Sequence, residues 1–397
     1  MNNFNFSTEK AIKYNDKIYF WSSKSNGLYQ YDEITGEMIL VTSFPKTDFA
    51  EAYLFSEMIR VGENFYIASK SGSLKFAIYN IISDEWKIFN ICDYYKNEKY
   101  MNSMSAFAEL IYHGDYIYLI GCMVPLVVRF NINTYEIIVL DEWTSYIDMK
   151  NIPEFINGKI WDENKYKQYN LPTIYFTHGS IYNNIAYYPM RCGNWLLKLD
   201  LDTSKTEIIT INSCVESFQE CIVIDDELWM LGCYQHVIVI YNLNNQSIRE
   251  VRLSKDVSPT IFKSALFEKP IVIDEKVYIL PATSEYAYCV NKNNYEVEQF
   301  CEKNDFCHTE IPGRAKNKII LIDGSKVYYI SNKTQKWFCY DLINMQAIEL
   351  HINYDASIVE RYNESVKIIK WKNTFKKTII EDEETDLKQY LHMLSKM

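Results

Sequence analysis

Three glutamates follow a phenylalanine at the same spacing in three well-separated stretches of the chain: Phe55-Ser-Glu57, Phe107-Ala-Glu109 and Phe218-Gln-Glu220. Carboxylates that come together can hold a cation, and burial can raise the pKa of one of them until it serves as a general base. The alternative is that these glutamates pair with lysines at a solvated rim, where each pair contributes little. What the glutamates do therefore depends on how the fold brings the three stretches together.

Other side chains that could do chemistry lie near these glutamates in the repeat pattern described below. His178 and His236 are the histidines that could join Glu220 in an acid–base or metal-binding set. Arg191 could hold an anion through its guanidinium group, and Tyr234 precedes His236 by two residues. We name Arg191, Tyr234 and His236 as candidate ligand-binding residues beside the three glutamates, and we assign no residue a catalytic role.

Known catalytic and cofactor motifs are absent from the sequence. It contains no glycine-rich phosphate loop, no nucleophile elbow, no His-Glu-x-x-His and no EF-hand loop. The local cluster Cys301, Cys307 and His308 supplies fewer ligands than the four that a structural zinc requires. We therefore predict neither a metal site nor a cofactor.

The elements that must position these residues are seven repeated β-hairpin units. Each unit contains a short apolar strand preceded by a tight polar turn, and a second hairpin whose turn begins with Asp or Asn. The first strands of this kind cover residues 17–21, 64–68, 116–120, 184–188, 227–231, 276–280 and 326–330. Four antiparallel strands per unit, A to D, at this repeat length are typical of a propeller blade. We predict an all-β, seven-bladed β-propeller over residues 1–352; a stacked solenoid is the alternative.

The pattern resembles the kelch repeat family over nearly residues 8–352. The resemblance rests on strands that end in Ile120-Gly121 and Leu231-Gly232, and on Phe76-Ala-Ile-Tyr-Asn80 followed by Trp86. No unit has the double glycine that is usual in kelch repeats, and most lack the tryptophan. The resemblance implies a propeller fold and, since kelch-like propellers are often protein-binding platforms, a binding function.

The two faces of such a propeller differ in this chain. The A–B and C–D turns are all short, whereas the long connections nearly all join strand D of one unit to strand A of the next. Long loops on a rigid scaffold often carry function, so we expect the functional surface on the D–A/B–C face. Aligned units place charged or polar residues at the start of strand A, around the mouth of the central channel: Lys10, Glu57, Glu109, Thr177, Glu220, Lys269 and Lys318.

An insertion of residues 141–172 between the third and fourth units lies on the same predicted face. It contains aromatic residues, including Trp143 and Trp161, which are good recognition groups. We name Trp143 and Trp161 as candidate partner-binding residues. The alternative is that the aromatic side chains form a small satellite core that holds the insertion against the propeller.

Composition limits the function classes. The chain has 397 residues, 48% of them hydrophobic, and a formal net charge of −11 without a long basic run, which disfavours a nucleic-acid partner. No secretory signal is recognisable at the N-terminus, and no apolar run approaches the ~20 residues needed to span a bilayer. We therefore expect a cytoplasmic protein with no membrane partner and with reduced cysteines.

Residues 353–397 form a C-terminal extension after the last repeat. Thr385 or Asp386 could cap a helix in which Leu387, Leu391 and Leu394 form one apolar stripe, so we predict a helix over 385–396. Such a helix would dock on the side of the propeller or be offered to a partner.

Two functions remain. The first is a cytoplasmic binding or scaffold propeller that recognises a protein, peptide, small ligand or glycan through its D–A/B–C face. The second is an enzyme, a hydrolase or lyase acting on a carbohydrate or peptide at the channel mouth. Convergence of Glu109, Glu220 and a histidine in one deep pocket would favour the second, and a flat mouth with scattered charges the first. The oligomeric state stays open.

Overall fold

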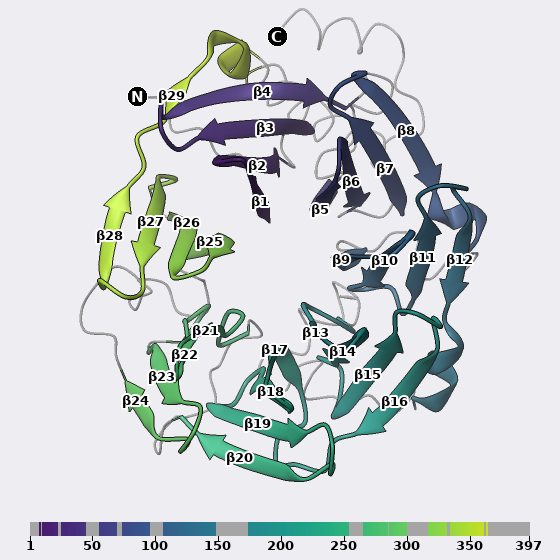
Figure 1. Ribbon diagram of the computed structural model, residues 1–397, viewed down its shortest axis with the longest axis vertical. Coiled ribbons are helices and arrows are strands. Elements are labelled where there is room, and N and C mark those ends of the chain that lie inside the picture. Colours follow the sequence, from purple (N-terminus) through teal and green to yellow (C-terminus); the bar gives the residue numbers. More distant parts are fainter. Residues whose placement is uncertain are drawn as a thin grey trace, which may run out of the picture.

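Seven sheets are arranged as blades around a central channel, each with four strands in sequence order, and a fifth short strand joins the sheet of blade 1 (Figure 1). The computed structural model describes residues 8, 10–22, 25–44, 55–69, 74–95, 106–147, 174–253, 265–284, 286–299, 317–331, 334–360 and 363. Within each blade all neighbouring strands are antiparallel and follow one another in sequence order from the channel outward. The predicted seven-bladed β-propeller with four antiparallel strands per blade is confirmed.

The strands have similar lengths in most blades. Blades 1 to 3 comprise β1 Ala11–Tyr14, β2 Lys17–Ser22, β3 Gly27–Asp32, β4 Glu37–Ser43; β5 Phe55–Val61, β6 Asn64–Ser69, β7 Lys75–Asn80, β8 Glu85–Asn90; and β9 Phe107–His113, β10 Tyr116–Gly121, β11 Val127–Asn131, β12 Ile137–Leu140. Blades 4 and 5 comprise β13 Ser180–Tyr182, β14 Ile185–Pro189, β15 Trp195–Asp200, β16 Thr206–Thr210; and β17 Phe218–Ile224, β18 Glu227–Gly232, β19 Val237–Asn242, β20 Ile248–Arg252. Blades 6 and 7 comprise β21 Ile271–Ile273, β22 Lys276–Ile279, β23 Tyr288–Asn291, β24 Val297–Gln299; and β25 Asn317–Asp323, β26 Lys326–Ser331, β27 Trp337–Asp341, β28 Gln346–Glu349.

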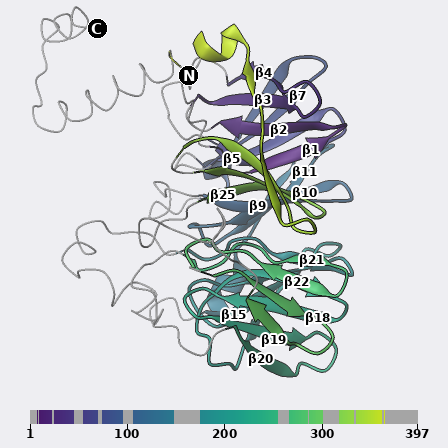
Figure 2. The same cartoon turned by 90° about the vertical axis from the view of Figure 1, so that its left-hand side faces the viewer.

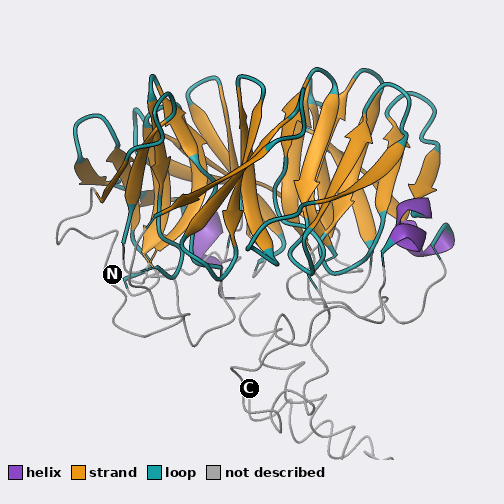
Figure 3. Ribbon diagram, turned by 90° about the horizontal axis from the view of Figure 1, so that it is seen from below, coloured by secondary structure: helices purple, strands orange, loops and turns teal. Residues whose placement is uncertain are grey.

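The tight turns explain why the hairpins form where they do, and they gather along one rim of the ring (Figure 3). In every A–B turn the first residue has a positive φ, a conformation that Gly, Asn and Asp adopt most readily: Asn15, Gly62, Gly114, Asn183, Asp225, Asp274 and Gly324. In every C–D turn the leading Asp or Asn accepts two backbone N–H groups through its side chain, as Asp32 does from Ile34 and Thr35.

Apolar side chains fill the space between neighbouring blades. The B strands are almost entirely buried, because they are enclosed on both faces by adjacent blades. Phe130 of blade 3, for example, packs against Phe76 and Phe89 of blade 2, with ring centroids 4.9 and 5.1 Å apart. The blades therefore share continuous cores, which fixes their relative positions around the channel.

The ring closes between the first and last blades with help from the C-terminal extension. A short strand, β29 (Asn353–Tyr354), pairs in parallel with the outer strand β4 of blade 1, and the backbone N–H of Asn353 donates to the Gly36 carbonyl at 2.7 Å (Figures 1 and 2). Near the A–B and C–D turns, Lys13 of blade 1 contacts Glu33 and Asp323 at 2.8 Å each, and Asp323 belongs to blade 7. Residues from the first blade, the last blade and the C-terminal extension therefore all contribute to closing the ring.

Helix is scarce in the described residues. Two short 3-10 helices, η2 (Ile91–Asp93) and η4 (Glu142–Tyr146), follow blades 2 and 3, and a helical turn covers residues 356–360. No helix among them is long and apolar enough to span a membrane. The predicted helix over 385–396 and most of the insertion, including Trp161, lie outside the described residues. The boundary at residue 352 stays a prediction.

Candidate functional site

The Phe-x-Glu spacing is the sequence of a β-bulge at the start of strand A. In blade 2, Phe55 pairs with Ser69 and Glu57 pairs with Ala68, so one extra residue stands between two partners that are consecutive. The phenylalanine and the glutamate therefore face opposite sides of the strand. The same irregularity occurs at the corresponding place in β9 and β17. Each phenylalanine enters the core, and Glu57 and Glu220 are buried as well.

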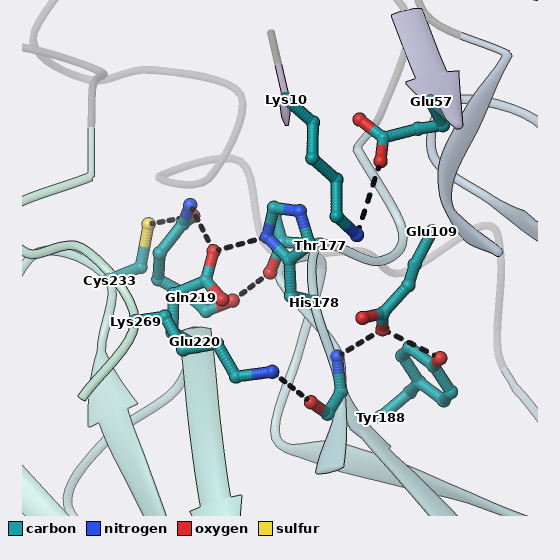
Figure 4. A network of polar contacts seen from close by, with 11 residues as sticks. Lys10, Glu57, Glu109, Thr177, His178, Tyr188, Gln219, Glu220, Cys233 and Lys269 are labelled. Atoms are coloured by element: carbon teal, nitrogen blue, oxygen red, sulfur yellow. Dashed lines mark hydrogen bonds and ion pairs between the residues drawn. The ribbon is translucent and has the colours of Figure 1, made fainter. Parts of the chain in front are cut away.

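A cavity of about 490 Å³ lies where the A strands line the channel. Its polar lining comes from blade 1 and from blades 3 to 6: Lys10, Glu109, His178, Glu220, Glu268 and Lys269. Two of the three glutamates singled out from the sequence thus share one cavity with a histidine. Glu57 lies beside it and interacts through Lys10 (Figure 4). The mouth is therefore a pocket lined by charges rather than a flat surface.

Glu109 is held as a carboxylate by several donors. Its Oε2 accepts the backbone N–H of Gly179 at 2.9 Å and the hydroxyl of Tyr188 at 2.8 Å (Figure 4). Burial opposes the charge, but the cations of Lys269, Lys10 and His178 and the Gly179 N–H outweigh it and lower the pKa of Glu109 to about 2. Burial and this carboxylate raise the pKa of Tyr188 well above its usual value.

His178 and Glu220 form an ion pair across the boundary of blades 4 and 5. Nδ1 of His178 lies 3.2 Å from Oε1 of Glu220, whose side chain is only 4% exposed. Burial disfavours the imidazolium, but the carboxylates of Glu220 and Glu109 raise the pKa of His178 to about 9. The second oxygen of Glu220, Oε2, is buried without a hydrogen-bond partner in the part of the chain that the structure describes. His178 is thus protonated at neutral pH.

Lys10 and Glu57 form the corresponding pair between blades 1 and 2. Their Nζ and Oε2 atoms are 3.6 Å apart, and the Lys10 side chain remains 28% exposed to the channel. Burial disfavours the ammonium group, yet the carboxylates of Glu57, Glu109 and Glu220 raise the pKa of Lys10 above its usual value. Burial also raises the pKa of Glu57, although Lys10 and His178 act in the opposite direction.

Glu268 is a cavity residue that the sequence alignment missed. Burial and the neighbouring Glu220 carboxylate raise its pKa to about 7, against the opposing charges of His178 and Lys318. Burial in turn lowers the pKa of Lys318 to about 8 despite the carboxylates of Glu268 and Glu57. Next to Glu268, Lys269 donates from Nζ to the Gly179 carbonyl at 2.9 Å. Glu268 and Lys318 therefore titrate close to neutral pH.

The other residues named from the sequence lie elsewhere. Nδ1 of His236 lies 3.1 Å from the Tyr288 hydroxyl, the residue is 7% exposed with its ring packed against Phe267, and burial lowers its pKa to about 4. His236 therefore does not join His178 and Glu220. Arg191 donates from Nη2 to the Tyr234 hydroxyl at 3.5 Å and lies over the Tyr234 ring. These two residues form a separate pair that does not line the cavity.

Trp143 begins the insertion and is fully buried. It packs against Phe176 with ring centroids 5.2 Å apart and donates Nε1–H to the Leu140 carbonyl at 3.1 Å. Trp143 belongs to the core that blades 2 to 4 share, and the predicted satellite core of the insertion stays a prediction. Among the described residues no group of three or more His, Cys, Asp or Glu side chains is arranged to hold a metal ion.

Comparison with known proteins supports the propeller fold and does not identify a family. No family model matches the chain, and no curated protein matches it in sequence. Virginiamycin B lyase from Staphylococcus aureus has a similar structure, with a TM-score of 0.56 and 9% identity over 84% of this chain and 94% of that one. BamB from Moraxella catarrhalis gives a TM-score of 0.51 and 11% identity over 82% of each chain.

These similarities extend over most of both chains at very low identity, so they show the fold alone. The similar structures are propellers of other families, one an enzyme by its name, and nothing in the comparisons shows a kelch family. The chain is a seven-bladed β-propeller with a charged cavity at its channel.

Proposed function

We propose that this protein is a ligand-binding propeller and that a small polar molecule binds at the mouth of its central channel, where the D–A connections meet the A strands. The observation that carries the proposal is that six charged side chains from five blades line one cavity of about 490 Å³. That volume falls within the range of small-molecule pockets, about 300–1,000 Å³. Buried charges are retained at a cost to stability, and recognition of a ligand is a common reason for keeping them.

A binding screen on the full chain tests this proposal. Thermal-shift measurements with amino acids, dipeptides, sugars, nucleosides and carboxylic acids should identify compounds that raise the Tm. The Lys269→Met variant should lose that shift, because it removes a charge from the cavity. Lys198→Met is the matched control, since Lys198 pairs with Glu207 on the outer strands of blade 4. Ligands that raise the Tm of both variants and of the native chain equally would contradict a binding site in the channel.

A second candidate is an acid–base enzyme at the same place, and the convergence of Glu109, Glu220 and His178 in one pocket is the observation that favours it. His178 and Glu268 line the same cavity, with pKa values of about 9 and about 7, so at neutral pH one can donate a proton and the other can accept one. A lyase or a hydrolase needs such a pair, and the propeller of similar structure from Staphylococcus aureus is a lyase by its name. This resemblance supports the candidate only at the level of the fold.

The enzyme candidate predicts a bell-shaped pH dependence. Turnover of chromogenic ester, glycoside or peptide substrates by the full chain should be highest between about pH 7 and about pH 9, where Glu268 is ionised and His178 is protonated. Glu268→Gln should remove the acidic limb. Activity that is unchanged in Glu268→Gln and His178→Gln would exclude this acid–base pair.

A protein or peptide partner at the D–A/B–C face and a cytoplasmic location complete the proposal. The acidic net charge of −11 and the scattered cysteines support the location. Fractionation of cells that produce the tagged chain tests it, and recovery in a membrane or secreted fraction would overturn it.

A further inference from the structure

The cavity has two chemically different parts. The charged mouth described above covers one part, and the wall beyond it is formed by the A strands of blades 5, 6 and 7. That wall contains mainly aliphatic side chains: Ile222, Ile271, Val272, Ile319, Leu321 and Ile322. Within β25 a bulge separates Ile319 from Leu321, which lets consecutive residues contribute to the lining. A ligand that fits both parts carries its charges at one end and an apolar body at the other.

The mouth presents both signs of charge in nearly equal number. Lys10, Lys269 and protonated His178 are its cations. Glu109, Glu220 and Glu268 are its carboxylic groups, and Glu268 is only partly ionised at neutral pH. A ligand with a single charge would satisfy one set and be repelled by the other, whereas a zwitterion interacts favourably with both sets and leaves the net charge unchanged.

All three cations of the mouth are accessible from the cavity, and the side chain of His178 is 36% exposed. Lys10 keeps part of its side chain open to the channel, and Lys269 uses one of its three N–H groups on the Gly179 carbonyl. Gly179 and Tyr188 both donate to Oε2 of Glu109, and Glu220 is enclosed beside His178. The ligand's carboxylate would therefore meet the cations of Lys10, Lys269 and His178, and its ammonium group would meet Glu268 and Glu109.

From this arrangement we infer that the channel recognises a zwitterion with an apolar body, the chemistry of an apolar amino acid or a short apolar peptide. The inference rests on the proposed function and names the ligand class for the same site. A free amino acid and a dipeptide share this chemistry, and they differ in the separation of their two charges. A cavity of about 490 Å³ has room for either.

Calorimetric titration of the full chain with matched probes tests the inference. L-leucine and L-leucyl-L-leucine are the two zwitterions. The compound 4-methylpentanoate lacks the ammonium group, 3-methylbutylamine lacks the carboxylate, and glycylglycine lacks the apolar body. One of the two leucine probes should bind at least about tenfold more tightly than each of the three incomplete probes. The leucine probe that binds more tightly shows whether the site takes a free amino acid or a dipeptide.

Two variants separate the parts of the site. Lys269→Met should weaken binding of the leucine probe about tenfold, with Lys198→Met as its unaffected control. Val272→Thr keeps the side-chain shape while making the wall polar. It should weaken binding of the leucine probe and leave binding of glycylglycine unchanged. Val139→Thr on β12 is the control for this variant.

Three results would overturn the inference: equal binding of a singly charged probe, equal binding of glycylglycine, or no binding by either leucine probe. The proposed function fails separately, when no compound of any class binds in a manner that Lys269→Met weakens. Binding of a sugar or nucleoside that depends on Lys269 would preserve the proposed function and reject the zwitterion.

Discussion

Nδ1 of His178 lies 3.2 Å from Oε1 of Glu220, and the two residues belong to neighbouring blades. His178 comes just before β13, and Glu220 sits in the bulge at the start of β17. The pair therefore links the charge of the cavity to the packing of blades 4 and 5. Any change in the protonation of His178 acts on both.

Removing the Glu220 charge should lower the pKa of His178 from about 9 toward its ordinary 6.5, because this carboxylate is the main group that stabilises the imidazolium. The Glu220→Gln variant tests this when the imidazole resonances are followed by NMR from pH 5 to 10. Glu207→Gln, on an outer strand, is the control and should leave the His178 titration unchanged. An unchanged midpoint in Glu220→Gln would mean that the pair does not form.

The same pair gives His178 a defined effect on stability. Its folded-state pKa of about 9 lies above the ordinary 6.5, so its contribution is complete below about pH 6.5 and is lost as the pH rises through about 9. The difference in unfolding free energy between the native chain and His178→Gln should therefore shrink over this interval. Urea denaturation at a series of pH values measures it.

Glu268 should make the chain less stable as the pH rises from about 4.5 through about 7. Its carboxyl keeps a proton in the folded state that it loses on unfolding, since its pKa is raised to about 7 from an ordinary 4.5. The effect has an upper limit of about 3 kcal/mol and should vanish in Glu268→Gln. Glu275→Gln, in the exposed A–B turn of the same blade, should keep the native pH dependence.

Ile358 should contribute strongly to ring closure. It is fully buried in a core formed by blades 1 and 7, and Ile358→Ala should cost about 2–5 kcal/mol of unfolding free energy. Ile343 is the control, because its side chain is 64% exposed in a turn of blade 7 and its replacement by Ala should change stability by less than about 0.5 kcal/mol. Equal effects would show that the extension does not secure the ring.

We expect Trp143 to contribute to the stability of the fold. Trp143→Ala removes a fully buried side chain and should cost about 3–5 kcal/mol, whereas Tyr146→Ala in the same 3-10 helix removes a side chain that is 75% exposed and should have little effect. Chemical denaturation of both variants measures the difference. A small loss in Trp143→Ala would return this residue to the list of recognition candidates.

The sequence was sufficient for the blades because local signals repeat seven times. The left-handed residue of each A–B turn and the side-chain acceptor of each C–D turn are specific residue types at fixed places. Ring closure was not predictable in the same way. β29 has two residues and no alternating pattern of its own, and its partner β4 lies more than 300 residues earlier in the chain.

The site was predictable only in part, for a geometric reason. Aligning the B strands brought Glu57, Glu109 and Glu220 to equivalent places, and the observed pairing of Glu57 and Glu109 with B-strand residues has that same register. Glu268 was not predicted because it precedes β21 and lies outside the strand. There the alternation of side chains along a strand no longer tells which way a side chain points. His178 also precedes its strand, and only the fold could show that it contacts Glu220 while His236 packs against Tyr288.

The closing strand has a consequence for synthesis on the ribosome. Blade 1 is made first, but the outer edge of β4 acquires its partner only when residues 353–354 emerge. Until then the nascent chain exposes an unpaired strand edge and the apolar face that blade 7 will cover, both of which invite aggregation. A stop codon or a translational pause before residue 353 would therefore lower the yield of soluble protein.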